Sequence, residues 1–226
     1  MAAPSGKTAI LIGATGLVGS ACLARLLESP VYTRVIAVSR RPVPLQHPKL
    51  VRVETAFDNL ADALSGMSAD DAFCCLGTTI RQAGTKAEFH KVDYGYALAF
   101  ADAARRQGAT HFLLVSALGA NAHSPVFYNR VKGLLEKEVE ALGYPRLSIF
   151  RPSLLLGSRS DTRPGEALGI RLSILVSPFL RGPFSPIHPV AGSDLATALV
   201  ACASAEKPLG VHRYYFDDIQ AWCAPA

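Results

Sequence analysis

Short apolar runs rich in β-branched residues alternate along the chain with longer stretches of helical periodicity. This alternation is typical of β-α-β units, which build a parallel sheet. The pattern predicts strands at 8–12, 34–38, 50–53, 72–76, 111–116, 146–150, 186–190 and 211–216. It predicts helices at 17–28, 58–64, 85–107, 126–142, 165–175 and 193–205.

Most of the predicted strands are continuously apolar, as expected for strands that helices cover on both faces. We therefore predict an α/β fold with a doubly wound parallel sheet. The rhythm changes after Arg151-Pro152, because residues 157–190 hold five of the fifteen prolines. We expect a single domain over 1–226, in which 157–190 and the C-terminal elements form a small substrate-side region.

The composition narrows the class of protein. A chain of 226 residues with 50% hydrophobic and 18% charged residues is neither disordered nor fibrous. A formal net charge of +5 leaves nucleic acid, an anionic membrane surface and a phosphorylated cofactor open as partners.

Cysteine usage and the N-terminal stretch bear on the compartment. The five cysteines form no C-x-x-C pair, which favours free thiols in a reducing environment. The uncharged run from Thr8 to Ala24 resembles a secretory signal. Its three central glycines would strongly destabilise an isolated apolar helix, which argues against that interpretation. We expect a cytoplasmic protein without stable membrane insertion.

A glycine-rich turn follows the first predicted strand and opens the first predicted helix. Its sequence is GATGLVG, residues 13–19. Glycines here allow a tight turn and a close approach of the backbone to a pyrophosphate, while the helix N-terminus offers free N–H groups. A tight turn without a ligand is the alternative. The turn predicts cofactor contacts from Gly13, Thr15, Gly16, Leu17, Val18 and Gly19.

The end of the second predicted strand indicates which dinucleotide binds. An acidic residue about twenty positions after the glycines is typical of NAD binding. Here the chain has Ser39, Arg40 and Arg41 instead. Guanidinium groups bind phosphate in a bidentate manner, so we predict NADP(H), with a solvated basic loop as the alternative.

Three polar residues form a pattern that indicates an acid/base catalytic site. Ser116 ends a predicted strand, and Tyr128 and Lys132 lie four residues apart on a predicted helix, hence on one face. A tyrosine has a pKa near 10, and a neighbouring ammonium stabilises its phenolate. Tyr128 would then exchange a proton at neutral pH, with Ser116 holding a substrate oxygen. A helix-surface pair beside a capping serine is the alternative.

These motifs together resemble the short-chain dehydrogenase/reductase superfamily, in its atypical branch with epimerase-like NAD(P)-binding Rossmann domains. Within that branch the chain is similar to the oxidoreductases related to the Tat-interacting protein. The resemblance rests on segments that run in order through residues 10–166: GATGLVG, FCCLGTT, VSALGA, YNRVKG, SIFRPSLLLG and TRPGE.

The resemblance implies an NADPH-dependent oxidoreductase that transfers hydride to or from a small carbonyl or alcohol. It implies that Leu76, Gly77 and Thr78 pass beside the nicotinamide ribose, and that Lys132 binds the ribose hydroxyls. Many superfamily members have an asparagine near the position of Asp93. This departure, with the short region 157–226, keeps open a cofactor-binding regulator without turnover. A nucleotide-sugar epimerase is a further alternative, which would need a fuller C-terminal substrate domain.

Other residues are assigned to structure or left open. Cys74 and Cys75 are interpreted as buried core thiols rather than nucleophiles, and no metal site is expected. The roles of His188 and of the loop 157–166 stay open. As partners we expect a small-molecule substrate and no nucleic acid; a homodimer is left open.

Overall fold

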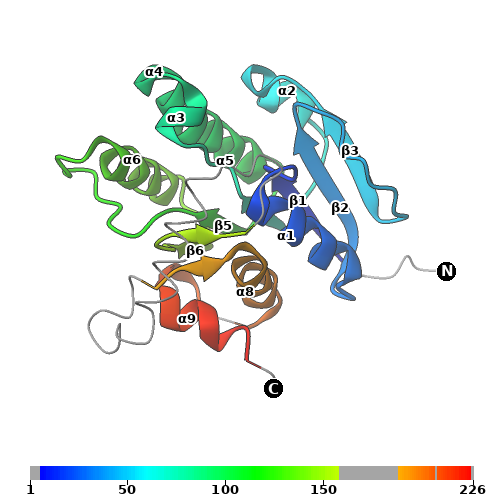
Figure 1. The fold of residues 1–226 in the computed structure, drawn as a ribbon. Helices are drawn as coiled ribbons and strands as arrows, with labels where there is room; N and C mark the ends of the chain where they lie inside the picture. The colour runs from blue at the N-terminus through cyan, green and yellow to red at the C-terminus, as the bar shows by residue number, and fades with distance from the viewer. Residues whose placement is uncertain (1–5, 158–187, 207, 225–226) are drawn as a thin grey trace.

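Parallel strands form one seven-stranded sheet in the order β3-β2-β1-β4-β5-β6-β9 (Figure 1). The computed structural model describes residues 6–157, 188–206 and 208–224. The strands are β1 (Lys7–Ile12), β2 (Tyr32–Ser39), β3 (Leu50–Glu54), β4 (Asp71–Cys74), β5 (His111–Val115), β6 (Arg146–Phe150) and β9 (Gly210–Tyr214). Short strands β7 (Leu155–Leu156) and β8 (Val190–Ala191) pair separately. The order reverses between β1 and β4, which places a ligand crevice at the carboxyl ends of these two strands.

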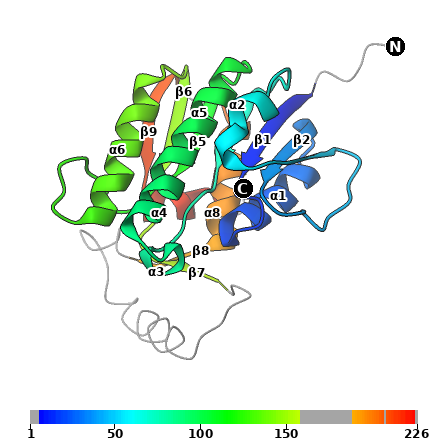
Figure 2. The ribbon, with the colours of Figure 1, turned by 90° about the horizontal axis from the view of Figure 1, so that it is seen from above.

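Helices cover both faces of the sheet (Figures 1 and 2). One face carries α1 (Leu17–Glu28), α8 (Gly192–Ser204) and α9 (Phe216–Ala221). The other face carries α2 (Leu60–Ala63), α5 (Ala97–Arg106) and α6 (Phe127–Ala141). The short helices α3 (Ile80–Ala83) and α4 (Lys86–His90) follow β4, before the π-helical turn η2 (Lys91–Tyr96).

The side chains of β1 show why its sequence is continuously apolar. Ala9 and Leu11 pack into the core under α1 and α8, whereas Ile10 and Ile12 pack into the core under α2 and α5. All four are fully buried, because alternate residues of a strand point to opposite faces and both faces are covered. The predicted doubly wound α/β fold is confirmed.

Most predicted elements are present, with shifted ends. The helix predicted at 85–107 is one helical stretch that includes η2, and it stops before Gly108, whose φ is +94°. The helix predicted at 58–64 begins instead as a 3₁₀ turn, η1 (Phe57–Asn59). The strand predicted at 211–216 ends at Tyr214, because Phe216 starts α9. The strands predicted at 72–76 and 111–116 end at Cys74 and Val115.

Two predictions concern the segment before α8. The strand predicted at 186–190 is present in its described part only at Val190, the first residue of β8, because His188 and Pro189 precede that strand. The predicted helix 165–175 and the segment TRPGE lie outside the described residues. The division into one domain with a substrate-side region stays a prediction.

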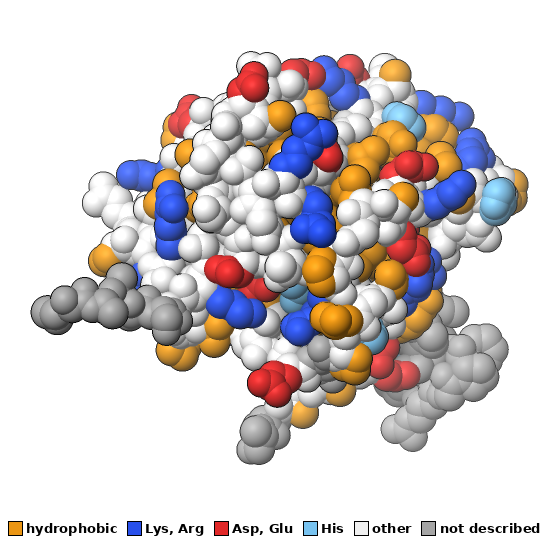
Figure 3. Space-filling model, turned by 180° about the vertical axis from the view of Figure 1, so that it is seen from behind, with side chains coloured by type: hydrophobic (Ala, Val, Ile, Leu, Met, Phe, Trp, Pro, Cys, Tyr) orange, Lys and Arg blue, Asp and Glu red, His pale blue; other side chains and the backbone are white. Residues whose placement is uncertain are grey.

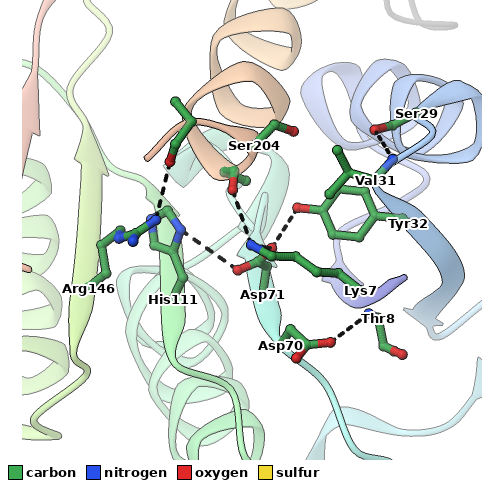
Figure 4. A network of polar contacts seen from close by, with 12 residues as sticks. Lys7, Thr8, Ser29, Val31, Tyr32, Asp70, Asp71, His111, Arg146 and Ser204 are labelled. Atoms are coloured by element: carbon green, nitrogen blue, oxygen red, sulfur yellow. Dashed lines mark hydrogen bonds and ion pairs between the residues drawn. The ribbon is translucent and has the colours of Figure 1, made fainter. Parts of the chain in front are cut away.

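A buried polar network lies at the amino ends of the strands, opposite the crevice (Figure 4). Asp71 accepts a hydrogen bond from the Tyr32 hydroxyl at 2.7 Å and pairs with the Lys7 ammonium at 3.1 Å. His111 lies beside it, with Nδ1 3.8 Å from Asp71 Oδ1 and Nε2 2.9 Å from the Ser148 hydroxyl. These contacts join the first residues of β1, β2, β4 and β5. The network therefore stabilises the sheet and lies away from the candidate site.

Surface charge is mixed on the side opposite the view of Figure 1. There, Lys and Arg side chains of the described residues lie among Asp and Glu rather than in one continuous basic patch (Figure 3). None of the helices in the described ranges combines the length and apolarity that crossing a membrane requires.

Candidate functional site

The glycine turn between β1 and α1 fits tightly against the end of β4. Gly13 has φ +87°, a conformation that favours glycine, and a Cβ there would lie 2.7 Å from the carbonyl of Cys75. The Gly16 N–H donates to the Gly13 carbonyl at 2.9 Å, which closes the turn. A side chain at Gly13 would therefore displace the backbone that follows β4.

The start of α1 leaves its N–H groups available to an anion. Its N-cap is Gly16, no side chain caps it, and no acidic residue lies in its first turn. Thr15 and Gly16 are exposed, whereas Val18 is buried in the core, so Val18 offers only its backbone. Leu17 packs against Gly157 and Gly192 instead. This unblocked helix N-terminus fits a pyrophosphate, as the sequence predicts.

The end of β2 presents two basic side chains near the same crevice. Arg40 and Arg41 are exposed, and neither forms an ion pair within the described ranges. The Arg40 guanidinium lies over the Phe57 ring, 5.2 Å from its centroid. Ser39 is buried, and its hydroxyl donates to the Arg41 carbonyl at 2.8 Å. Ser39 therefore shapes the loop, while the two guanidiniums are free to meet a phosphate.

Helix α6 carries Tyr128 and Lys132 and is held close to the loop after β5. A Cβ at Gly133 would lie 2.5 Å from the Asn121 Cα, so the glycine lets loop and helix touch. Tyr128 is half-buried, with its ring 5.5 Å from that of Phe89. Lys132, one turn later, is buried.

The Lys132 ammonium has a buried counterion. Its Nζ lies 2.7 Å from Asp93 Oδ1, and the two side chains are 3% and 0% exposed. Burial alone would lower the pKa of Lys132, but the Asp93 carboxylate and the nearby Tyr128 outweigh it and raise that pKa. Lys132 therefore stays protonated at neutral pH.

The second oxygen of Asp93 reaches the loop that follows β4. Oδ2 accepts a hydrogen bond from the Thr78 N–H at 2.8 Å. A Cβ at Gly77 would lie 3.7 Å from Asp93 Oδ1 and 3.9 Å from Lys132 Nζ. The structure thus brings the predicted Leu76–Thr78 loop to Lys132 at the carboxyl edge of the sheet. Asp93 lies in η2, and such π-helical turns are frequent at functional sites.

Ser116 lies just beyond β5, and its hydroxyl is already bound. It donates to Glu136, which is buried one turn after Lys132 on the same face of α6. Glu136 also accepts from Arg151 Nε at 3.0 Å, and Arg151 Nη1 donates to the Tyr215 hydroxyl at 3.0 Å. The described contacts of Ser116 thus lead to the C-terminal segment. Its predicted role toward substrate stays a prediction.

Sequence reasoning missed several of these partners. Glu136 follows Lys132 by four residues, as Lys132 follows Tyr128, so helical spacing was the available signal. Arg151 stands where the sequence rhythm changes, and nothing in its local sequence indicates Glu136. Phe57 beneath Arg40 gives no sequence signal either, because it comes from another element.

The remaining candidate residues, Cys74, Cys75 and His188, pack against other side chains of the fold. Cys74 is buried, and burial raises the pKa of its thiol to about 12, so it is no thiolate at neutral pH. Cys74 and Cys75 pack into opposite cores, as their interpretation as core thiols requires. His188 stacks on Phe216 with ring centroids 4.8 Å apart. Within the described ranges no cluster of three or more His, Cys, Asp or Glu side chains suits a metal ion.

An open glycine turn, a helix N-terminus and a tyrosine–lysine pair at the topological switch point define a dinucleotide-binding Rossmann protein. The chain belongs to the NAD(P)H-binding family, whose model matches residues 13–145. The predicted relation to the atypical short-chain dehydrogenases/reductases is confirmed by curated relatives. It is 38% identical over 168 residues to Protein HTATIP2 of Rattus norvegicus, covering 72% of this chain and 68% of the relative.

A second group of relatives covers more of the chain. Protein FMP52-1, mitochondrial, of Scheffersomyces stipitis is 36% identical over 201 residues, covering 87% of this chain and 88% of the relative. Among solved structures, MoeE5 in complex with UDP-glucuronic acid and NAD matches with a TM-score of 0.69 at 20% identity. That match covers 92% of this chain and 76% of MoeE5, and it supports the fold.

The names of the FMP52 relatives correct one prediction. Five of them, from different fungi, are named mitochondrial, and they are 31–36% identical to this chain. The expectation of a cytoplasmic protein is therefore wrong. Free thiols also suit proteins inside mitochondria, so cysteine usage did not distinguish the two compartments.

Proposed function

We propose that this protein is an NADPH-dependent oxidoreductase that acts on a small carbonyl or alcohol. The observation that carries the proposal is the position of the Tyr128/Lys132 face beside the Leu76–Thr78 loop, with Gly77 facing Lys132 Nζ. The glycine turn at the same edge of the sheet fits the pyrophosphate. When bound, the nicotinamide ring supplies or accepts a hydride at its C4.

Tyr128 is proposed as the acid/base. During reduction its hydroxyl gives a proton to the substrate oxygen while the carbonyl carbon takes the hydride, and oxidation reverses both transfers. Lys132 is held as an ammonium by Asp93, so it stabilises the phenolate that forms on Tyr128. The buried Lys132 ammonium also faces the loop where a ribose hydroxyl would lie.

Ser116 is proposed to hold the substrate oxygen as an acceptor. Its hydroxyl hydrogen goes to Glu136, so its oxygen presents lone pairs to a ligand. A substrate hydroxyl can donate to such an oxygen, whereas a carbonyl cannot. This arrangement favours recognition of the alcohol form.

NADPH is proposed over NADH because of Arg40 and Arg41. Both guanidiniums are exposed at the end of β2, and Arg40 is oriented by Phe57. Several structural neighbours are complexes with NAD, but their identity to this chain is at most 20%, so they support the fold and do not decide the nucleotide.

The test is a Tyr128→Phe variant assayed for NADPH oxidation with a panel of aldehydes and ketones. Removing the hydroxyl leaves the ring against Phe89, so we expect unchanged NADPH affinity. Turnover should fall about a hundredfold or more. Arg130→Ala, at a half-buried position on the same helix, is the control. Equal activity of Tyr128→Phe and wild type would contradict the assigned role.

A second candidate is a protein that binds NADPH and signals its presence to a partner without turnover. Two observations favour it: Asp93 offsets the charge of Lys132, and Glu136 already binds the Ser116 hydroxyl. This candidate predicts NADPH binding with no NADPH oxidation across the whole carbonyl panel. Steady oxidation with any member, lost in Tyr128→Phe, would refute it.

We also propose that the protein acts in or on mitochondria, on the basis of the FMP52 relatives' names. Subcellular fractionation of the full-length chain, with an epitope tag at the C-terminus, tests this. Recovery of the tagged chain with mitochondrial markers is expected, and its recovery only with cytosolic markers would contradict the proposal.

A further inference from the structure

Asp93 joins two parts of the site that are distant in sequence. One carboxylate oxygen lies 2.7 Å from the Lys132 ammonium on α6. The other accepts the Thr78 N–H of the loop after β4 at 2.8 Å. A single buried side chain from η2 therefore fixes both the lysine and the loop beside it.

The surroundings of the ammonium leave Asp93 as its main charged partner. The other titratable groups that act on Lys132 are Tyr128 from α6 itself and the Cys74 thiol from β4. Cys74 is neutral because burial raises its pKa to about 12. Glu136, one turn further along α6, is bound by Arg151. Among the described residues, Asp93 is the carboxylate paired with Lys132.

We propose that Asp93 is a positioning residue for the Tyr128/Lys132 pair: it fixes the ammonium and the Thr78 backbone together, and its charge offsets the charge that Lys132 presents to Tyr128. This inference deepens the proposed function and rests on it for its catalytic meaning. Asp93 itself touches Lys132 and Thr78 and is not assigned a proton-transfer step.

The negative charge has a consequence that a neutral side chain would lack. A nearby positive charge lowers the pKa of a phenol, and an adjacent carboxylate reduces that effect. With Asp93 paired to Lys132, the charge near Tyr128 is that of an ion pair rather than that of an unpaired cation. Removing the charge of Asp93 would leave the Lys132 cation near Tyr128 without its carboxylate partner.

The experiment separates the hydrogen bond from the charge. Asp93→Asn keeps an oxygen for the Thr78 N–H but removes the charge, whereas Asp93→Ala removes both. Asp102→Asn on α5 is the matched control, because its ion pair with Arg106 is exposed. Circular dichroism and thermal melting establish that each variant folds. Asp93→Ser, which keeps an acceptor without charge, replaces Asp93→Asn if that variant does not fold.

The first readout is the ionisation of Tyr128, taken as the ultraviolet phenolate difference spectrum between each protein and its Tyr128→Phe counterpart across pH. In Asp93→Asn we expect the midpoint to fall by about one pH unit. The second readout is NADPH affinity, which should stay within about twofold of wild type in Asp93→Asn and weaken about tenfold in Asp93→Ala. Asp102→Asn should match wild type in both.

Two results would overturn the inference. An unchanged or raised Tyr128 midpoint in Asp93→Asn would contradict the proposed charge effect. Equal NADPH affinity in Asp93→Ala and wild type would contradict the proposed positioning of the loop. Neither readout needs turnover. If none of the carbonyl compounds in the panel supports NADPH oxidation by the wild-type protein, the proposed function fails. The titration still decides the role of Asp93 in that case.

Discussion

Gly19 packs directly against the carbonyl of Gly13: a Cβ on Gly19 would lie 2.6 Å from the Gly13 carbonyl carbon. The first turn of α1 is thus pressed onto the end of β1, and the helix N-terminus points at the crevice from a fixed position. Because the conflicting atoms belong to the backbone, no side-chain rotation relieves the contact.

Gly19→Ala should therefore weaken both the fold and the cofactor site. We expect overpacking to lower the free energy of unfolding by about 2 kcal/mol and NADPH binding to be lost. Urea unfolding and fluorescence titration with NADPH measure the two effects. Gly95→Ala is the control, because a Cβ there meets open space. NADPH affinity equal to wild type in Gly19→Ala would show that the turn does not hold the pyrophosphate.

Replacing Arg40 and Arg41 together by alanine should change the choice of nucleotide. The 2′-phosphate is absent from NADH, so affinity for NADPH should fall about tenfold or more while affinity for NADH stays the same. Calorimetric titration with both nucleotides checks this. Arg34→Ala, at an exposed position nearer the start of β2, serves as the control. An equal loss for both nucleotides would argue against phosphate recognition.

Acid should destabilise the protein through His111. Burial lowers the pKa of His111 to about 3, far below its value in the unfolded chain. The unfolded state therefore binds the proton first, and stability is lost as pH falls from about 6.5 toward 3. From pH 6.5 to pH 5 the loss from this group is about 1.6 kcal/mol.

The neighbouring Asp71 acts in the opposite direction, because burial raises its pKa and the folded state binds its proton more tightly. Comparing wild type with His111→Gln isolates the histidine, since Gln keeps a partner for Ser148 but does not titrate. Denaturant unfolding between pH 5 and about 7 should show a shallower pH dependence in the variant. Identical slopes would contradict the role of His111.

Glu136→Gln should destabilise the fold strongly. The change removes the charge of a buried carboxylate that binds both Arg151 and Ser116, and it leaves the Arg151 cation without its charged partner. Breaking such a buried pair costs about 3 kcal/mol or more in the free energy of unfolding. Glu138→Gln, on the same helix without an ion pair in the described ranges, should change it by less than about 0.5 kcal/mol. Equal stability of the two variants would refute the assignment.

Local patterns in the sequence carry the fold and part of the site. The glycines of the turn and the Tyr128–Lys132 spacing are short-range features, and each places its residues on one turn or one helix face whatever the rest of the chain does. The parallel order of most strands follows because helices separate them along the chain, whereas β2 and β3 are joined by residues 40–49 without a helix. The compartment was predicted wrongly because cysteine usage does not separate cytosol from mitochondria.

The tertiary structure decided which residues of different helices and strands contact one another. Asp93 pairs with Lys132, which is 39 positions away in the sequence. Arg151 binds Glu136 of α6. Phe57, at the start of η1, lies under the Arg40 guanidinium. Buried charges need partners, but the sequence alone does not say which partner the packing will supply. The sequence by itself determined a doubly wound sheet with a dinucleotide turn and a tyrosine–lysine helix. The three-dimensional packing determined the carboxylates that hold that helix's lysine and the neighbouring serine in place.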